Sequence, residues 1–137
     1  NSLASIERWE EARKWLIENM RLVALFDLPS NVFADAGVNT TLIVAYKPSA
    51  TELEKLKEKN YNVFVKDIHK VGYEIRTSKR VKFFSPIYKI DKQTFEVKQD
   101  KDGNPLLDEE FTATVAEFKE WCLGQEKTLQ DLFIKEK

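Results

Sequence analysis

One aromatic side chain lies in a setting where it could bind a flat ligand. Phe33 sits between the polar residues Asn31 and Asp35 in the segment 30–39. An aromatic ring in such a loop can stack on a nucleobase. From spacing alone, the commoner outcome is that the ring folds back over the neighbouring strand ends as an apolar plug. Both interpretations stay open at this point.

The loop with Phe33 joins two apolar, β-prone runs at 22–28 and 40–46. Each run is nearly continuous and of strand length, so we expect two strands with both faces buried. Pro29 ends the first strand, because proline has no amide hydrogen to donate. The connection is too long for a two-residue hairpin turn, and long loops between strands often carry function.

A second candidate region is basic. Between Lys55 and Lys82 there are nine Lys and Arg residues against three Asp and Glu, a net charge of +6. Such a segment can face nucleic-acid phosphates. On charge alone, a solvated face of an ordinary domain explains it better.

Residues for catalysis within the chain are few. His69 is the only histidine and has no second His or Cys near it in the sequence, so no metal site is predicted. The four glycines are far apart, which excludes a Gly-rich phosphate loop. Cys122 falls on the apolar face of an expected helix, where a buried inert thiol is usual. No catalytic residue is predicted in this chain.

The expected elements include both helices and strands. Ser49 and Glu52 have the spacing of a capping box at a helix start. In the C-terminal helix, Val115, Phe118 and either Trp121 or Cys122 should face inward. Helices are expected over about 5–19, 49–59 and 112–123, with a helical turn in 125–137; strands over 22–28, 40–46, 61–68 and 73–76; and a hairpin of 85–90 with 94–98.

Length and composition indicate one soluble globular domain or part of one. The 137 residues are 42% hydrophobic and 33% charged. No apolar run approaches the roughly twenty residues of a membrane span, so no membrane partner is expected. The single cysteine is typical of a reducing cytoplasm. The chain begins with Asn1 rather than Met, and we expect it to be a fragment.

Several motifs in the first half of the chain resemble one enzyme family. They are the helix Arg-Lys-Trp-Leu-Ile-Glu-Asn at 13–19, Leu-Pro at 28–29, Asn-Val-Phe at 31–33, Gly37 and the strand at 40–47. Together they resemble the catalytic domain of adenine-specific DNA methyltransferases, above all the modification (M) subunit of type I restriction systems. Val-Phe-Val-Lys-Asp at 63–67 and Val-Gly-Tyr-Glu at 71–74 also resemble that family, whereas the chain beyond residue 85 matches it only loosely.

The resemblance implies a mixed α/β fold, a fragment of the seven-stranded sheet of S-adenosylmethionine-dependent methyltransferases. Residues 22–28 would be its sixth strand and 40–46 its antiparallel seventh strand, beside the sixth. Residues 1–84 would form the C-terminal part of the catalytic domain, and 85–137 a hairpin and helical extension.

The resemblance also implies roles for individual residues. Phe33 would stack on an adenine flipped out of the duplex, because the paired amine is unreachable inside the stack. Pro29, Ser30 and Asn31 would shape its loop. The weaker candidates for contact with the DNA backbone are Lys79, Arg80 and Lys82.

Two motifs of the family are missing. There is no Gly-x-Gly turn for the methyl donor and no Asn-Pro-Pro-aromatic motif, and Asn104-Pro105-Leu106 is no substitute. We therefore expect S-adenosylmethionine to be bound by a missing upstream part and the fragment alone to be inactive. In the full protein, the expected partners are DNA and the specificity and restriction subunits of a type I system.

Two other function classes stay open. The chain could be a non-catalytic assembly module that docks a partner protein through its basic segment and C-terminal helix. It could also be a small nucleic-acid binder that acts alone, which predicts binding that weakens with salt.

Overall fold

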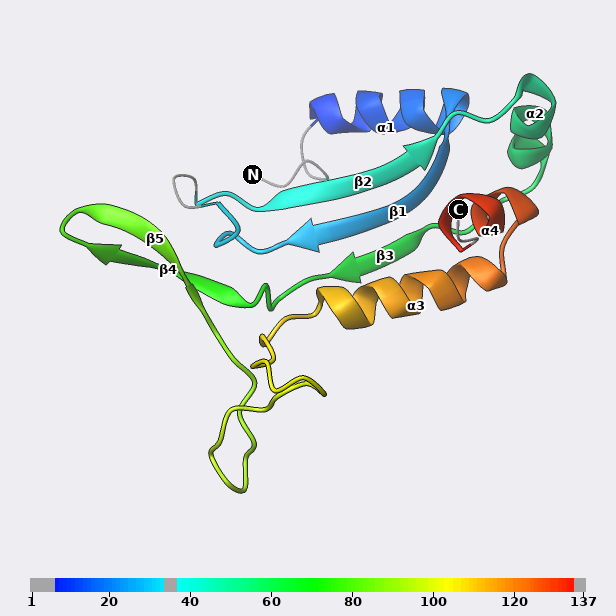
Figure 1. The fold of residues 1–137 in the computed structure, drawn as a ribbon. Coiled ribbons are helices and arrows are strands. Elements are labelled where there is room, and N and C mark those ends of the chain that lie inside the picture. The colour runs from blue at the N-terminus through cyan, green and yellow to red at the C-terminus, as the bar shows by residue number, and fades with distance from the viewer. Residues whose placement is uncertain (1–6, 34–36, 135–137) are drawn as a thin grey trace. The chain divides into compact units, whose positions relative to one another are not determined.

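A computed structural model describes residues 7–33 and 37–134, which form four helices and two sheets in a mixed α/β arrangement (Figure 1). These residues divide into two compact units. The first unit comprises Asn1–Ser30 and Val38–Asp67, and the second comprises Asn31–Gly37 and Ile68–Lys137. The boundary expected between residues 84 and 85 concerned a family catalytic domain and stays a prediction.

The first unit is built on a three-stranded sheet of order β2-β1-β3. The central strand β1 (Arg21–Leu28) pairs antiparallel with β2 (Thr40–Tyr46) and parallel with β3 (Phe64–Asp67) (Figure 1). The antiparallel pairing expected of the first two strands is confirmed. The strand expected over 61–68 is shorter, because the residues before Phe64 are engaged by a side chain at the start of β1, as described below.

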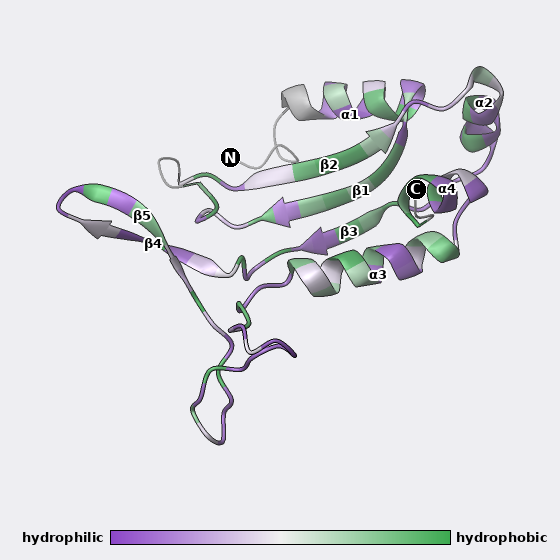
Figure 2. Ribbon diagram, in the orientation of Figure 1, coloured by the Kyte–Doolittle hydropathy of each residue, from purple (hydrophilic) through white to green (hydrophobic). Residues whose placement is uncertain are grey.

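Burial follows the apolar runs only in part. Arg21–Ala24 at the start of β1 is buried residue after residue, so the expected two-sided burial is right there. On β2 it is wrong: every residue is at best half-buried, and Leu42 is 53% exposed. Figure 2 shows that both strands are nonetheless largely apolar. β2 lies at the edge of this sheet, and no further strand among the described residues pairs with its outer side.

Two helices complete the first unit. In α1 (Glu7–Asn19), Leu16 is half-buried and Ile17 is 45% exposed.

Helix α2 (Ala50–Glu58) begins as the capping motif predicts. The Ser49 hydroxyl accepts a hydrogen bond from the Glu52 amide at 3.2 Å. The Glu52 carboxylate accepts one from the Tyr46 hydroxyl at 2.8 Å, which ties the helix start to the end of β2. Leu56 is buried beneath the helix.

The second unit contains a β-hairpin that the sequence did not reveal. β4 (Tyr73–Ser78) pairs antiparallel with β5 (Val81–Pro86) (Figure 1). The hairpin expected from 85–90 and 94–98 is only partly right, because residues 85 and 86 pair back onto β4. What remains of it is a short ladder, with an Ile90–Val97 bridge and a Lys98 amide that donates to the Lys89 carbonyl at 2.9 Å.

The second unit ends in two helices, α3 (Phe111–Leu123) and α4 (Lys127–Phe133), both close to their expected positions. Cys122 of α3 and Leu129 of α4 are fully buried, and the Phe118 and Phe133 rings meet edge to face at 5.2 Å. Val115, expected to face inward, is 52% exposed.

The inner positions of α3 are Thr114, Phe118 and Cys122, at successive steps of four residues, which are neighbours on one helix face. Among the residues described, no helix combines the length and the apolarity that crossing a membrane requires.

Candidate nucleic-acid interface

The hairpin of the second unit follows a glycine, at a position where any other residue would be strained. Gly72 has a φ of +87°, and a Cβ built there would lie 3.3 Å from the Cβ atoms of both Leu107 and Glu109. Its carbonyl accepts a hydrogen bond from the Ile87 amide at 2.8 Å. Val71 and Glu109 form a bridge beside it. The base of the hairpin is therefore fixed against the chain that leads into α3.

The pairing register separates two faces of the hairpin. Ile75 lies opposite Phe84, so these residues share a face with Tyr73, and the Tyr73 and Phe84 rings pack edge to face at 4.9 Å. Arg76 lies opposite Phe83 on the other face. Phe83 and Phe84 are 43% and 52% exposed, so each face presents an aromatic side chain to its surroundings.

The turn of the hairpin consists of two cationic residues in an unfavourable conformation. Lys79 and Arg80 have φ values of 50° and 67°. A two-residue turn with both φ values positive normally uses Asn-Gly, because other side chains are strained there. Lys82 follows on β5, and all three side chains are exposed. The three residues predicted to contact the DNA backbone thus lie together at one end of the hairpin.

A fourth cation lies on the hairpin. Arg76 is exposed, and its Nε pairs with the Glu74 carboxylate at 2.5 Å. Glu74 offsets the charge of Arg76, so the net positive charge at this end of the hairpin comes from Lys79, Arg80 and Lys82 and suits a polyanion.

The segment with Phe33 belongs to the same unit as the hairpin. The Tyr73 hydroxyl donates a hydrogen bond to the Val32 carbonyl at 3.0 Å. Asn31 and Val32 are half-buried, whereas the Phe33 side chain is 49% exposed. The ring is accessible in the described structure, and its neighbour is held by the first residue of β4.

Two other residues from the sequence analysis are Pro29 and Asp35, and one residue that it missed is Tyr73. Pro29 belongs to the first unit, directly after β1, and is half-buried. Asp35, which flanked Phe33 in the sequence argument, lies outside the described residues. Tyr73 was assigned to a strand and given no role. A tyrosine that follows a glycine at the start of a strand is only a weak sign of a functional role. Its hydrogen bond to a carbonyl 41 residues earlier cannot be predicted from the neighbouring sequence.

Hydrogen bonds lower the pKa values of three carboxyl groups of the second unit. Hydrogen bonds from Gln93 and Thr94 lower the pKa of Asp91, and one from Asn104 lowers the pKa of Asp100. Burial acts to raise the pKa of Glu109, but hydrogen bonds from the Thr112 side chain and backbone and from the Phe111 amide lower it overall. These acids stabilise turns and a helix start, which accounts for them without acid–base catalysis.

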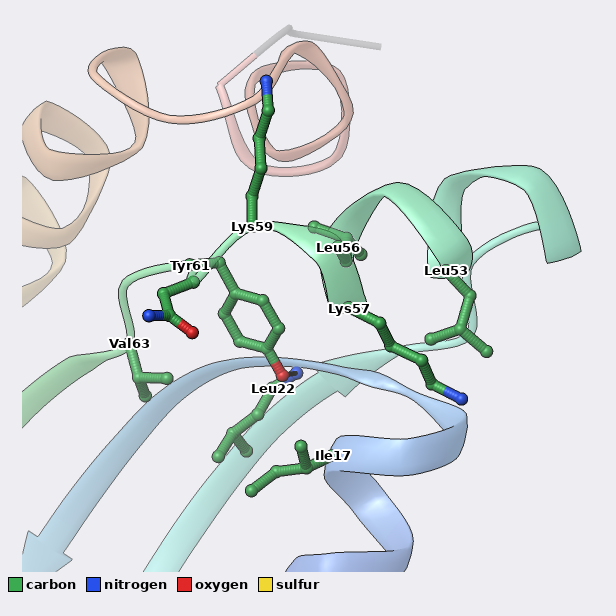
Figure 3. Close-up of a pocket in the computed structure, with 9 residues that line it drawn as sticks. Ile17, Leu22, Leu53, Leu56, Lys57, Lys59, Tyr61 and Val63 are labelled. Atoms are coloured by element: carbon green, nitrogen blue, oxygen red, sulfur yellow. Dashed lines mark hydrogen bonds between the residues drawn. The ribbon is translucent and has the colours of Figure 1, made fainter.

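The first unit contains an apolar groove. It encloses about 420 Å³. Figure 3 shows Tyr61 reaching toward Leu22, and Lys59 extending away from the apolar side chains. Its lining comprises Ile17, Leu22, Leu53, Leu56, Lys57, Lys59, Asn60, Tyr61 and Val63.

That lining includes no carboxylate, imidazole or thiol and no glycine, so the groove offers contact for apolar groups but no acid–base chemistry. Across residues 7–33 and 37–134, no group of three His, Cys, Asp or Glu side chains is placed to hold a metal ion.

No protein-family model, no curated protein sequence and no solved structure matches this chain. The resemblance to adenine-specific DNA methyltransferases rests on the motifs quoted above.

Proposed function

We propose that this chain is the C-terminal part of the catalytic domain of an adenine-specific DNA methyltransferase, similar to the modification subunit of type I restriction systems. One observation carries the proposal. Phe33, which its Asn-Val-Phe motif predicts to be the base-stacking residue, is 49% exposed on a segment that is hydrogen-bonded to the basic β4–β5 hairpin. An aromatic ring and a cluster of cations therefore belong to one structural unit, as binding of an extruded base and its flanking phosphates requires.

In this proposal, Phe33 stacks on the flipped adenine, and Pro29 and Asn31 set the course of its loop. Lys79, Arg80 and Lys82 contact phosphates beside the target base. Phosphate contacts position a protein on the duplex but carry no sequence information. Sequence recognition would come from a separate specificity subunit, and a restriction subunit would complete the assembly in the cytoplasm.

The methyl donor does not fit the apolar groove of the first unit. The apolar groove of the first unit has no glycine that would let the backbone approach the donor and no carboxylate that would bind its ribose hydroxyls. We assign S-adenosylmethionine to a part of the protein upstream of this chain, so the fragment alone would be inactive.

The sheet supports the same proposal. β1 and β2 form the antiparallel pair expected of the sixth and seventh strands. The outer edge of β2 has no strand partner among the residues described, although its sequence Thr-Thr-Leu-Ile-Val-Ala-Tyr is apolar and uninterrupted by proline. An exposed apolar edge of this kind is normally covered in the complete protein. A further strand from the upstream part would cover it.

The experiment compares Phe33→Ala with Phe95→Ala in the full-length protein. Phe95 is 81% exposed in the same unit and provides the same chemical change away from the proposed site. Because base stacking is worth about 1–3 kcal/mol, methylation of duplex DNA by Phe33→Ala should fall by about tenfold or more, with donor affinity unchanged. Equal kinetics for the two variants would refute the stacking role.

A cheaper observation separates the enzyme from the other function classes. The gene upstream of this chain should encode a Gly-containing donor turn and an Asn-Pro-Pro-aromatic motif. An initiator Met directly before Asn1 would contradict the proposal.

The exposed cations of the hairpin favour one alternative, a nucleic-acid binder that acts without methylation. It predicts salt-sensitive DNA binding by a protein that transfers no methyl group.

A further inference from the structure

We propose that Tyr73 is a positioning residue, which holds Phe33 in place through the Val32 carbonyl and couples the base-stacking segment to the β4–β5 hairpin. The inference rests on the proposed function and names a residue with no role in it so far.

A fixed backbone before Tyr73 and two contacts of its side chain hold this residue in place. The preceding residue, Gly72, is locked at a φ of +87° between the chain at Leu107 and the base of the hairpin. The Tyr73 ring packs edge to face on Phe84 at 4.9 Å. The hydroxyl, at the far end of the ring, donates to the Val32 carbonyl at 3.0 Å. A rigid aromatic side chain thus connects the paired base of the hairpin with a segment 41 residues earlier.

The hydrogen bond to the Val32 carbonyl directly affects the orientation of the Phe33 side chain. The carbonyl belongs to the peptide plane between Val32 and Phe33, and a peptide group is planar and stiff. Holding its oxygen limits rotation about the two backbone bonds that aim the Phe33 side chain. A hydrogen bond of ordinary net strength shifts an equilibrium between two conformations by about three- to tenfold. Without it, the equilibrium constant for the stacking-competent conformation of Phe33 should fall by that factor, and the apparent affinity for the flipped base should fall by up to the same factor.

The same ring pair links the segment to the cationic turn. Phe84 lies on the same hairpin face as Lys82, two residues away along β5. A phosphate bound near Lys82 therefore contacts the strand on which Tyr73 packs. DNA contact by the hairpin and the placement of Phe33 share one physical connection.

The test is Tyr73→Phe in the full-length methyltransferase. This change removes one oxygen atom and keeps the ring that packs on Phe84. The matched control is Tyr88→Phe, which removes the same atom from a residue of the same unit that is 37% exposed. Base flipping is followed with 2-aminopurine in place of the target adenine, because its fluorescence rises when the base leaves the stack.

We expect Tyr73→Phe to lower the 2-aminopurine signal and kcat by about three- to tenfold, with the KM for the methyl donor unchanged. Tyr88→Phe should behave as the wild type. Amide hydrogen exchange should become faster at Val32 and Phe33 and stay as slow as before within β4 and β5.

The remaining outcomes overturn the inference. Faster exchange throughout the hairpin of Tyr73→Phe would assign Tyr73 a merely structural role. If Tyr73→Phe matches Tyr88→Phe while Phe33→Ala is impaired, the positioning role is wrong and the proposed function stands. If Phe33→Ala is also unimpaired, the stacking role that the proposed function gives to Phe33 fails as well.

Discussion

The guanidinium carbon of Arg21 lies 4.0 Å from the centroid of the Tyr61 ring. Arg21 is the first residue of β1 and is fully buried, and its Nη1 donates hydrogen bonds to the carbonyls of Leu22 and, at 2.7 Å, of Asn62. The Tyr61 hydroxyl oxygen accepts a hydrogen bond from the Leu22 amide at 3.4 Å. These contacts fasten the residues before β3 to the start of β1, where the two strands run parallel.

This pair should show a measurable coupling energy. A desolvated cation–π contact is worth about 2 kcal/mol, so Arg21→Met and Tyr61→Leu should each destabilise the chain, and the double-mutant cycle should give a coupling of about 1–2 kcal/mol. The measurement is the free energy of unfolding in urea. Tyr61→Phe is the control, because it keeps the aromatic face and should cost less than about 1 kcal/mol. A coupling near zero would show that the Tyr61 ring does not contribute to holding Arg21.

The turn of the β4–β5 hairpin offers a test in which stability and DNA binding change in opposite directions. Replacing Lys79 and Arg80 by Asn-Gly in a double variant supplies the residues that positive φ values favour. It should raise the free energy of unfolding by about 1–2 kcal/mol. The same variant loses two charges, so the slope of log K against log salt should fall by about 2 in full-length protein.

The matched control for the hairpin turn is the removal of two other exposed cations of the second unit, by Lys92→Gln and Lys101→Gln. These residues lie in turns outside the hairpin. Their loss should leave the salt slope unchanged. If the two double variants change the slope equally, the charges at the hairpin turn have no special place in DNA binding.

Much of the fold could be predicted from local patterns. β1 and β2 follow from apolar runs that are bounded by Pro29 and Pro48, and α2 follows from its capping motif. The inner face of α3 was harder, since Thr114 is buried and Val115 is exposed. Which of two neighbouring residues faces inward depends on what packs against the helix, and the helix sequence does not contain that information.

The sequence predicted individual residues of the candidate site but not their arrangement. Phe33 and the three cations could be named from sequence, but the hairpin that gathers them could not. Its turn is Lys-Arg, without the Asn or Gly that marks such turns, so residues 81–86 gave no sign of pairing with β4. The bond from Tyr73 to Val32 is a tertiary contact across 41 residues and follows from no periodicity.

The loop that follows Asp100 should be sensitive to acid. The Asn104 amide donates to the Asp100 carboxylate at 2.9 Å and lowers the pKa of that group below its ordinary value of 3.8. Because the folded pKa is lowered, this contribution to stability is complete above the ordinary value and is lost as the pH falls through the folded pKa. NMR titration should show the Asn104 amide shifting with a midpoint below 3.8. Asp100→Asn should abolish the transition, and a midpoint at or above the ordinary value would contradict the assignment.

The most direct test of the central claim is a photochemical crosslink between the target base and Phe33. The methylation site of the full-length protein is first mapped in DNA, and 5-iodouracil then replaces the target adenine, since it joins on irradiation to an aromatic ring stacked on it. We predict that mass spectrometry will find the crosslink at Phe33, and that Phe33→Ala will lose it while Phe95→Ala retains it. A crosslink to another aromatic residue, with Phe33 unmodified, would contradict the proposed role of this chain.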